Sequence, residues 1–257
     1  MVTVVMAALV LAVAQGREDC RYEATREATV RASARDRLEL IARAGALRVE
    51  GRSGVSEVRV VGRACASSRD LLEQLVIESG RSGSSVRIEV PELDRDFDWG
   101  FNRYATLDLE VIVPAGMAGG ITDGSGAMSV RGLGELSITD GSGEIRVEDL
   151  SGGLRVEDGS GSLTVTTVDG DVEIEDGSGD IQIRGVTGSV EIRDGSGGID
   201  ISDVGGSVRV PSDGSGSVDA SDVEGDLTVA SKGSGSVAHR NVRGTVDVPV
   251  RDRRRRR

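Results

Sequence analysis

Aromatic side chains are almost absent from this chain of 257 residues. Two Phe, one Trp and two Tyr make up 2% of the sequence. A conventional globular core buries more aromatic area than this, and surfaces that bind nucleic acid by base stacking depend on such rings. The formal net charge of −12 also argues against a polyanionic partner. We therefore expect no nucleic-acid binding, and a core built from Val, Leu and Ile.

Chemically reactive side chains are equally few. His239 is the only histidine, and Cys20 and Cys65 are the only cysteines. The chain contains no Gly-x-Ser-x-Gly nucleophile motif, and no pair of carboxylates stands out as an acid and a base. A single histidine also has no second histidine with which to bind a metal. The sequence therefore predicts a protein that is not an enzyme, with no cofactor and no catalytic or metal-binding residues.

The first residues are typical of an export signal. Residues 1–14, MVTVVMAALVLAVA, are apolar but too short to span a bilayer, and the run ends in the small-x-small pattern of a signal-peptidase site. No Lys or Arg precedes the run, so a buried N-terminal strand is the alternative. We expect export to the periplasm, cell surface or medium, with no transmembrane segment in the mature chain. In an exported protein, Cys20 and Cys65 predict one disulfide; two unpaired buried thiols are the alternative.

A four-residue motif, Asp-Gly-Ser-Gly, recurs through the second half of the chain. Successive copies follow one another at nearly equal intervals, and Lys232 replaces the Asp in a seventh copy. A second glycine-containing turn lies about halfway between copies. Each half-unit alternates polar and aliphatic residues, the pattern of a strand with one buried face. The six Asp of the motif are Asp123, Asp140, Asp158, Asp176, Asp194 and Asp213.

Two architectures fit such nine-residue strand-and-turn units, an antiparallel meander and a parallel solenoid. When the copies of the motif are aligned, like residues coincide, as in the aliphatic row Leu163, Ile181, Ile199 and Val218. A coil placed directly over its predecessor requires this alignment, whereas a meander has no need for two regularly alternating turn types. We therefore predict an all-β fold, a parallel β-solenoid with about 18 residues and two short strands per coil.

The rest of the chain predicts a cap for this solenoid. Three segments within residues 37–62 repeat the nine-residue pattern and are expected to form its first coils. Ser67 to Leu75 predicts one short N-terminal helix, capped and laid across that end. The expected organisation is a signal peptide (1–14), an N-terminal β region and cap (15–115), the repeat solenoid (116–250) and an Arg-rich tail (251–257).

The repeated Asp residues form a turn ladder for which two interpretations compete. The first is structural: their oxygens cap the amides of the Gly-Ser-Gly turn while solvent screens their charge. The second is a ladder of calcium sites, as in the β-roll. The residues that follow Gly-Ser-Gly do not repeat the Asp that a β-roll needs. We therefore favour structural corners.

The segment LDRDFDWGFNRY, residues 93–104, is the candidate ligand-binding loop. It holds four of the five aromatic residues, interleaved with three Asp. Rings beside carboxylates suit glycan stacking, and alternating Asp suggests a calcium loop, although Gly and Glu are not where an EF-hand needs them. The simplest interpretation is a loop that packs its rings on the flank of the solenoid. The candidate ligand-binding residues are Phe97, Trp99, Phe101 and Tyr104.

Two further features have structural interpretations. By register, His239 replaces aliphatic residues of an inward row, which predicts a packed ring or one exposed at the end of the solenoid. The Arg-rich tail predicts a solvated end that prevents another strand from adding to the last coil. Binding of anionic lipid, lipopolysaccharide or nucleic acid by the tail is the alternative.

The Asp-Gly-Ser-Gly and Asp-Val-x-Gly motifs, the exported N-terminus and the opening DCRYEATREATV (from Asp19) resemble the bacterial putative-adhesin family of β-strand repeats. That family is a domain of unknown function, similar to the head domains of auto-transporter adhesins. The resemblance implies an adhesin or cell-envelope binding scaffold whose partner is a surface glycan or an envelope protein. A structural self-assembly module is the alternative. A polysaccharide-active β-helix enzyme is a weaker one, based on fold analogy alone.

Overall fold

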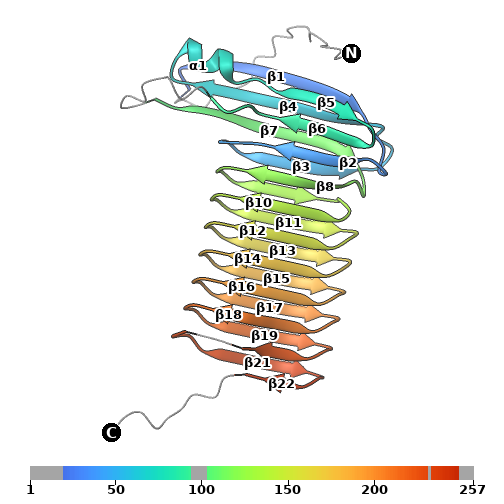
Figure 1. Cartoon of the computed structure of the whole chain (residues 1–257), viewed down its shortest axis with the longest axis vertical. Coiled ribbons are helices and arrows are strands. Elements are labelled where there is room, and N and C mark those ends of the chain that lie inside the picture. Colours follow the sequence, from blue (N-terminus) through green and yellow to red (C-terminus); the bar gives the residue numbers. More distant parts are fainter. Residues whose placement is uncertain (1–19, 94–102, 231–232, 249–257) are drawn as a thin grey trace.

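A computed structural model describes residues 20–93, 103–230 and 233–248 of the chain. It is an all-β rod built from two facing sheets of eleven strands each, with the strands running across the long axis (Figure 1). Within the described residues, no helix has the length and apolar character needed to cross a membrane.

We call the two sheets sheet A and sheet B. In spatial order, sheet A contains β1 (Tyr22–Arg31), β4 (Glu57–Ala66), β7 (Ala105–Pro114), β3 (Leu47–Arg52), β9 (Met128–Arg131), β11 (Ile145–Leu150), β13 (Leu163–Val168), β15 (Ile181–Val186), β17 (Ile199–Val204), β19 (Val218–Val223) and β21 (Val237–Val242). Starting from the same end, sheet B contains β5 (Glu78–Ser82), β6 (Ser85–Glu89), β2 (Arg37–Ile41), β8 (Ala118–Asp123), β10 (Leu136–Asp140), β12 (Leu154–Asp158), β14 (Val172–Asp176), β16 (Val190–Asp194), β18 (Val208–Asp213), β20 (Leu227–Val229) and β22 (Val246–Asp247).

From β8 onward the chain alternates between the sheets and advances along the rod, which makes a β-solenoid. Each strand pairs in parallel with the strand of its own sheet in the next coil. Leu163 of β13 lies opposite Ile181 of β15, which in turn lies opposite Ile199 of β17. These partners are one sequence repeat apart, so the spacing of the repeat is the spacing of the coils.

The interior consists of aliphatic rows that run along the rod. In β15, Ile181 and Ile183 are buried, whereas Gln182 between them is exposed. Each fully buried Val, Leu or Ile contributes roughly 1.5–3 kcal/mol through the hydrophobic effect. The side chains of one coil pack on equivalent side chains of the next, so a coil is stable only beside its neighbours.

Each sheet A strand from β11 to β21 ends at a corner where its next-to-last residue has the left-handed conformation. Asp149, Thr167, Asp203, Asp222 and Asn241 occupy this position with φ of 52–59°, and Gly185 occupies it with φ 72°. Asp, Asn and Gly tolerate this conformation better than other residues, which explains their recurrence here. Thr is β-branched and is the exception among them.

The last glycine of each Asp-Gly-Ser-Gly is required by the stacking of the coils. Gly179 has φ 147°, and a Cβ atom at this position would overlap the carbonyl oxygen of Gly161 in the preceding coil. Equivalent overlaps recur at Gly143, Gly161 and Gly197. A side chain here would therefore force adjacent turns apart, in addition to the strain of the positive φ.

The expectation that residues 37–62 form successive solenoid coils is only partly correct. β2 and β3 do make a coil, but it lies between the coil of β6 and β7 and the coil of β8 and β9. The third segment is part of β4, which pairs antiparallel with β1 and with β7. β4 continues for ten residues without a corner, so it cannot turn into the next coil. We call β1, β4, β5, β6, β7 and the helix α1 the cap.

The segment Ser67–Leu75 contains the helix α1 (Arg69–Gln74), which lies inside the chain, after β4, rather than at its N-terminus. Ser68 is its N-cap, and the Ser68 hydroxyl accepts a hydrogen bond from the Leu71 amide at 3.3 Å. Arg26 of β1 donates to the carbonyls of Leu72 and Leu75 at 2.9 and 2.7 Å. These bonds satisfy carbonyls at the C-terminal end of the helix and hold it on the cap.

Candidate functional site

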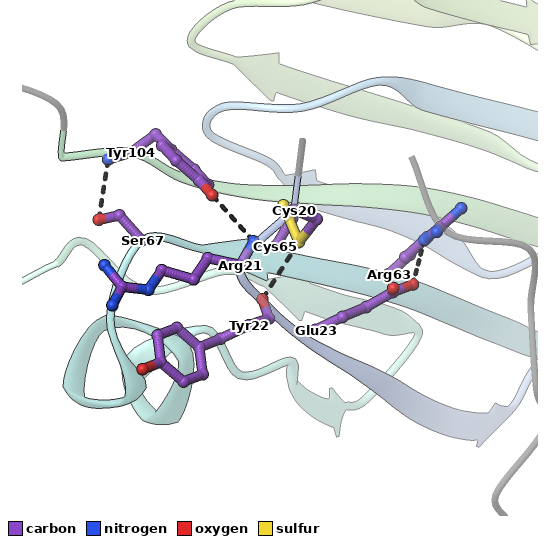
Figure 2. Close-up of a disulfide and its surroundings, with 8 residues drawn as sticks. All are labelled: Cys20, Arg21, Tyr22, Glu23, Arg63, Cys65, Ser67 and Tyr104. Atoms are coloured by element: carbon purple, nitrogen blue, oxygen red, sulfur yellow. Dashed lines mark hydrogen bonds and ion pairs between the residues drawn. A yellow bond between two sulfur atoms is a disulfide. The ribbon is translucent and has the colours of Figure 1, made fainter. Parts of the chain in front are cut away.

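The cap end of the molecule carries the disulfide predicted from the sequence. Cys20 and Cys65 are bonded, with their Cα atoms 5.7 Å apart. Figure 2 shows that this bond joins the chain just before β1 to the adjacent strand β4. An ion pair between Glu23 of β1 and Arg63 of β4 lies close by. The disulfide therefore fixes the outermost strand of sheet A to its neighbour.

Of the four candidate ligand-binding residues, Tyr104 is the only one among the described residues; Phe97, Trp99 and Phe101 lie outside them. The Tyr104 hydroxyl accepts a hydrogen bond from the Arg21 amide at 2.9 Å (Figure 2). The Tyr104 amide donates to the Ser67 hydroxyl at 3.2 Å, and the Ser67 amide donates to the Tyr104 carbonyl at 2.9 Å. Tyr104 thus joins three segments of the cap, as a structural residue would.

The six Asp of the repeat form one continuous row, which we call the Asp ladder (Asp123, Asp140, Asp158, Asp176, Asp194 and Asp213). Each is the last residue of a sheet B strand and lies opposite the next in register. Neighbouring strands of a sheet are about 4.8 Å apart. Two ionised carboxylates at this separation repel by about 1 kcal/mol at the dielectric constant of water and by more in a buried site.

The expectation that solvent screens these carboxylates is wrong. All six Asp are buried, with 4–7% of their surface exposed. The Oδ1 atoms of Asp158, Asp176 and Asp194 each accept a hydrogen bond from the amide two residues ahead, at 3.1–3.2 Å. The capping of the turn amides is therefore correct, but it takes place inside the rod.

The second carboxylate oxygen of several ladder residues has no hydrogen-bond partner. This holds for Oδ2 of Asp123, Asp158, Asp176 and Asp194, all of them buried atoms. Burial is the main cause that raises the pKa of Asp123 to about 7 and that of Asp176 to about 6. It also raises the pKa of Asp140, Asp158 and Asp194. The ladder is thus the strongest electrostatic anomaly of the described chain.

Sequence reasoning missed the burial of the ladder although a signal was present. In β12, Leu154 and Val156 point inward, and Asp158 follows at the same alternate spacing. The period-two pattern of a strand therefore places the Asp on the buried face. Asp as a residue type favours a solvated turn. The alternation of inward and outward positions along the strand predicts its burial correctly.

The outer face of sheet B carries a groove that crosses five coils. Its volume is about 640 Å³, and its lining extends from Glu135, just before β10, to Arg209 on β18. Arg155 contacts Glu173 at 2.6 Å and Glu157 at 3.2 Å, and other arginine–glutamate pairs continue the pattern along the rod. These pairs are exposed, so each adds little to stability. The arginine and glutamate side chains that line the groove offer a ligand both hydrogen-bond donors and acceptors.

The outer face of sheet A differs from that of sheet B. Its central row is Arg146, Thr164, Gln182, Asp200 and Asp219, one residue from each of five successive coils. Only Arg146 in this row makes an ion pair, with Glu144 at 2.7 Å, in the part of the chain that the structure describes. The two faces therefore present different chemistry on the same scaffold.

A second hollow lies where the cap meets the coils. It has a volume of about 550 Å³, and Ala44, Leu75, Val90, Leu93 and Leu107 are among its lining residues. Arg43 and Glu92 also line it and form an ion pair at 3.2 Å. Its walls are mainly apolar, unlike those of the groove on sheet B.

The other candidate residues do not form a catalytic or metal cluster. No group of three His, Cys, Asp or Glu side chains converges to hold a metal in residues 20–93, 103–230 and 233–248. His239 pairs in register with Ala220, as its place in the inward row predicts, and is exposed in the final coil of sheet A. The Arg-rich tail lies outside the described residues.

Comparison with known proteins gives fold neighbours but no family. No model of a protein family matches the sequence, and no curated protein matches it significantly. A solved structure from Parabacteroides distasonis, described as a putative lipid binding protein, aligns with a TM-score of 0.53 at 14% identity, over 88% of this chain and 94% of that one. A structure from Bacteroides fragilis, described as a putative adhesin, aligns with a TM-score of 0.37 at 13% identity, over 90% of this chain and 99% of that one. The first of these supports the fold.

Proposed function

We propose that this chain is an exported, non-enzymatic β-solenoid that serves as an adhesin-like or cell-envelope binding scaffold. In this proposal the outer face of sheet B binds an extended polar ligand, a surface glycan or an envelope protein. The observation that carries the proposal is the groove across five coils, lined by charges of both signs. A groove that repeats every coil suits a ligand that is itself long and repetitive.

The neighbours are consistent with such a role without specifying it. The Parabacteroides protein shares the fold and is described as a putative lipid binding protein. Others, from Bacteroides fragilis and Clostridium sporogenes, are described as a putative adhesin and a putative cell adhesion protein. Fold alone does not fix a function, so the argument depends on the groove and its charges.

Binding to a glycan array, to isolated cell envelopes and to phospholipid vesicles tests the proposal on the mature protein. Replacing both Arg155 and Arg209 by Gln removes two cations from the groove on sheet B. Replacing Arg146 and Arg184 by Gln makes the same change of charge on sheet A. We expect the first variant to weaken binding about tenfold or more, which corresponds to roughly 1.4 kcal/mol. We expect the control to bind like the unmodified protein.

Two results would contradict this function. One is equal loss of binding in both variants, because the groove would then not be the site. The other is an unmodified, folded protein that binds none of the glycans, envelopes or vesicles. A third result would be selective binding of vesicles that neither pair of substitutions weakens. It would indicate that the ligand binds in the apolar hollow near Leu93 and Leu107 instead.

Self-assembly is the second candidate, and strand edges at both ends favour it. In the described residues, β1 pairs only with β4 and β5 only with β6 at the cap end. At the other end, β21 pairs only with β19 and β22 only with β20. An unpaired edge can add a strand from another molecule. Sedimentation over a wide range of concentrations separates the candidates, because a self-assembling chain forms larger species as concentration rises.

A further inference from the structure

The Asp ladder is a row of buried acids, and no Lys or Arg is buried among the residues that the structure describes. Among the described residues, no Lys, Arg or His forms an ion pair with Asp123, Asp140, Asp158, Asp176 or Asp194. An ionised carboxylate that is buried and unpaired is strongly disfavoured. Stacking such groups in neighbouring coils adds repulsion to the cost of burial. The charge of these five carboxyl groups therefore has to be neutralised by something other than a basic side chain of the described residues.

We propose that the Asp ladder retains protons at neutral pH, shared between neighbouring carboxyl groups, and that this proton store makes the stability of the solenoid depend on pH. A proton on Oδ2 of one Asp turns an unpartnered acceptor into a donor. The next carboxyl in the row, one coil away, supplies an acceptor. Sharing protons removes charge from the row and leaves in place the hydrogen bonds that the turn amides donate to Oδ1.

The surroundings of the ladder favour the protonated form. Inward positions of the facing strands in sheet A are aliphatic, among them Leu163, Val165, Ile181 and Ile183. A groove of about 550 Å³ lies over the ladder, and the charged residues lining it are Glu157, Glu175 and Arg193 besides the ladder itself. Asp180, in the neighbouring turn, adds a further negative charge near Asp194.

Among the described residues, Arg193 is the one cation that lines this groove, and acidic side chains already contact it. Its guanidinium contacts Glu191 at 2.5 Å, Glu175 at 3.6 Å and Glu173 at 3.7 Å. All three contacts are to outward carboxylates rather than to the ladder. The local field is therefore negative on balance, which holds protons on the buried acids.

The raised pKa values of the ladder residues also favour the protonated form. Burial lifts the pKa of Asp123 to about 7 and that of Asp176 to about 6, with neighbouring ladder residues raising both further. A carboxyl whose pKa rises on folding binds more protons in the folded chain than in the unfolded chain. The stability it contributes is greatest in acid, and it falls as the pH rises from about 4 toward the folded pKa.

A metal ion is the competing way to neutralise the row. Ca²⁺ takes six to eight oxygen ligands, about two or three of them from acidic side chains in a typical site. No three acidic groups converge on one point in the described part of the chain. The geometry of a single row therefore suits protons better than a divalent cation, and the experiment distinguishes the two.

The test compares thermal melting from pH 5 to pH 8 for three proteins. The ladder variant carries Asp158→Asn, Asp176→Asn and Asp194→Asn, because Asn keeps the Oδ1 acceptor and is neutral at every pH. The control carries Asp200→Asn, Asp203→Asn and Asp219→Asn, which remove the same charge from exposed positions. Mass spectrometry verifies that the new Asn-Gly sequences remain amides.

We expect the Tm of the unmodified protein to fall between pH 5 and pH 8. At pH 8 the ladder variant should melt higher than the unmodified protein, by about 2–4 °C for each stabilising replacement. Its Tm should fall less between pH 5 and pH 8 than that of the unmodified protein, because only three of the six ladder carboxyl groups remain. The control should keep the pH dependence of the unmodified protein. At pH 6 the infrared spectrum of the unmodified protein should contain the carbonyl band of protonated carboxylic acids, and the control should retain it.

Other outcomes overturn the proposal. A Tm that does not fall from pH 5 to pH 8, or a control that removes the fall as fully as the ladder variant, means that the ladder is not the proton store. If Ca²⁺ at pH 8 raises the Tm of the unmodified protein but not that of the ladder variant, the row binds a cation instead. If the ladder variant does not fold, absence of the carbonyl band from the unmodified protein at pH 6 rejects the proposal.

Discussion

The cap and the coil stack are held together by different means, although both belong to the same two sheets. In the cap, the ten-residue strands β1, β4 and β7 pair antiparallel, and a disulfide and the Tyr104 contacts join segments far apart in the sequence. In the stack, short parallel strands recur with each sequence repeat and bury the same aliphatic rows. The cap depends on individual contacts, whereas the stack depends on repetition.

This difference predicts how far along the rod the destabilising effect of a substitution should extend. In a repeat structure each unit contacts only its neighbours, so stability is approximately a sum of unit and interface contributions. A defect in one coil of the stack weakens that coil and the two beside it. A defect in the cap exposes the end of both sheets, where the first coil has no other neighbour. The following substitutions compare the two regions, from the largest expected effect to the smallest.

A charge inside the stack should have the largest effect. Ile183 is 2% exposed and lies in register between Val165 and Ile201. Ile183→Asp buries an unpaired carboxylate in an aliphatic row and should cost more than about 4 kcal/mol of unfolding free energy, or abolish folding. Gln182→Asp, one residue away on the exposed face, should change stability by less than about 0.5 kcal/mol. Chemical denaturation of both variants measures this, and equal effects would refute the register of the sheet.

Removal of the disulfide should have the next largest effect, confined to the cap. Cys20 and Cys65 close a loop with a sequence separation of 45, for which the chain-entropy model gives about 3–4 kcal/mol. Cys20→Ser with Cys65→Ser should therefore increase hydrogen exchange in β1 and β4 while β15 to β19 keep their protection. A uniform loss of protection along the rod would mean that the two regions unfold as one unit.

A methyl group at the stacked corner should have an intermediate effect on the stack. Gly179→Ala places a Cβ against the carbonyl oxygen of Gly161 and imposes a strained φ. We expect a loss of about 1–3 kcal/mol. Gly80→Ala is the matched control, because a Cβ at Gly80 meets nothing within 4 Å. If thermal melting shows the same cost for both, close contact between the turns of adjacent coils is not what requires glycine.

Loss of the helix cap should have the smallest effect. Ser68→Ala removes the hydroxyl that accepts from the Leu71 amide, which should cost about 1 kcal/mol. Ser68→Asp should restore stability, because Asp is an equally good N-cap. Failure of the Asp variant to restore the melting temperature would show that the Ser68 hydroxyl is needed for another contact in the cap.

The stack could be predicted from the sequence because its information is local and repeated. The row Leu163, Ile181 and Ile199 appears in the sequence at the spacing at which it stacks. The cap could not be predicted in the same way. In the cap, the antiparallel strands β4 and β7 pair residues such as Cys65 and Thr106. No repeat in the sequence relates these two residues, so the pairing cannot be predicted from spacing. The insertion of the coil of β2 and β3 between later coils is equally invisible to a periodic pattern.

The candidate site was predicted less completely than the stack. The six Asp were identified as turn residues, but their burial follows from the alternation of inward and outward positions along each strand, not from the residue type. The groove on sheet B was not predicted, because its ion pairs join residues such as Arg155 and Glu173 across coils. A mixture of signs in the sequence predicts a solvated face; only the register shows which charges meet. Three of the four loop aromatics lie outside the described residues, so their role stays a prediction.

The stacking of coils in parallel is the central claim, and one distance tests it most directly. Arg146 and Asp219 are exposed residues of sheet A, joined in register through Thr164, Gln182 and Asp200. Spin labels on cysteines introduced at these two positions, measured by electron paramagnetic resonance, should be about 19 Å apart, four strand spacings. An antiparallel meander would place every intervening strand between them and give about 38 Å, eight spacings. The shorter distance is the result we predict, and the longer one would contradict the solenoid.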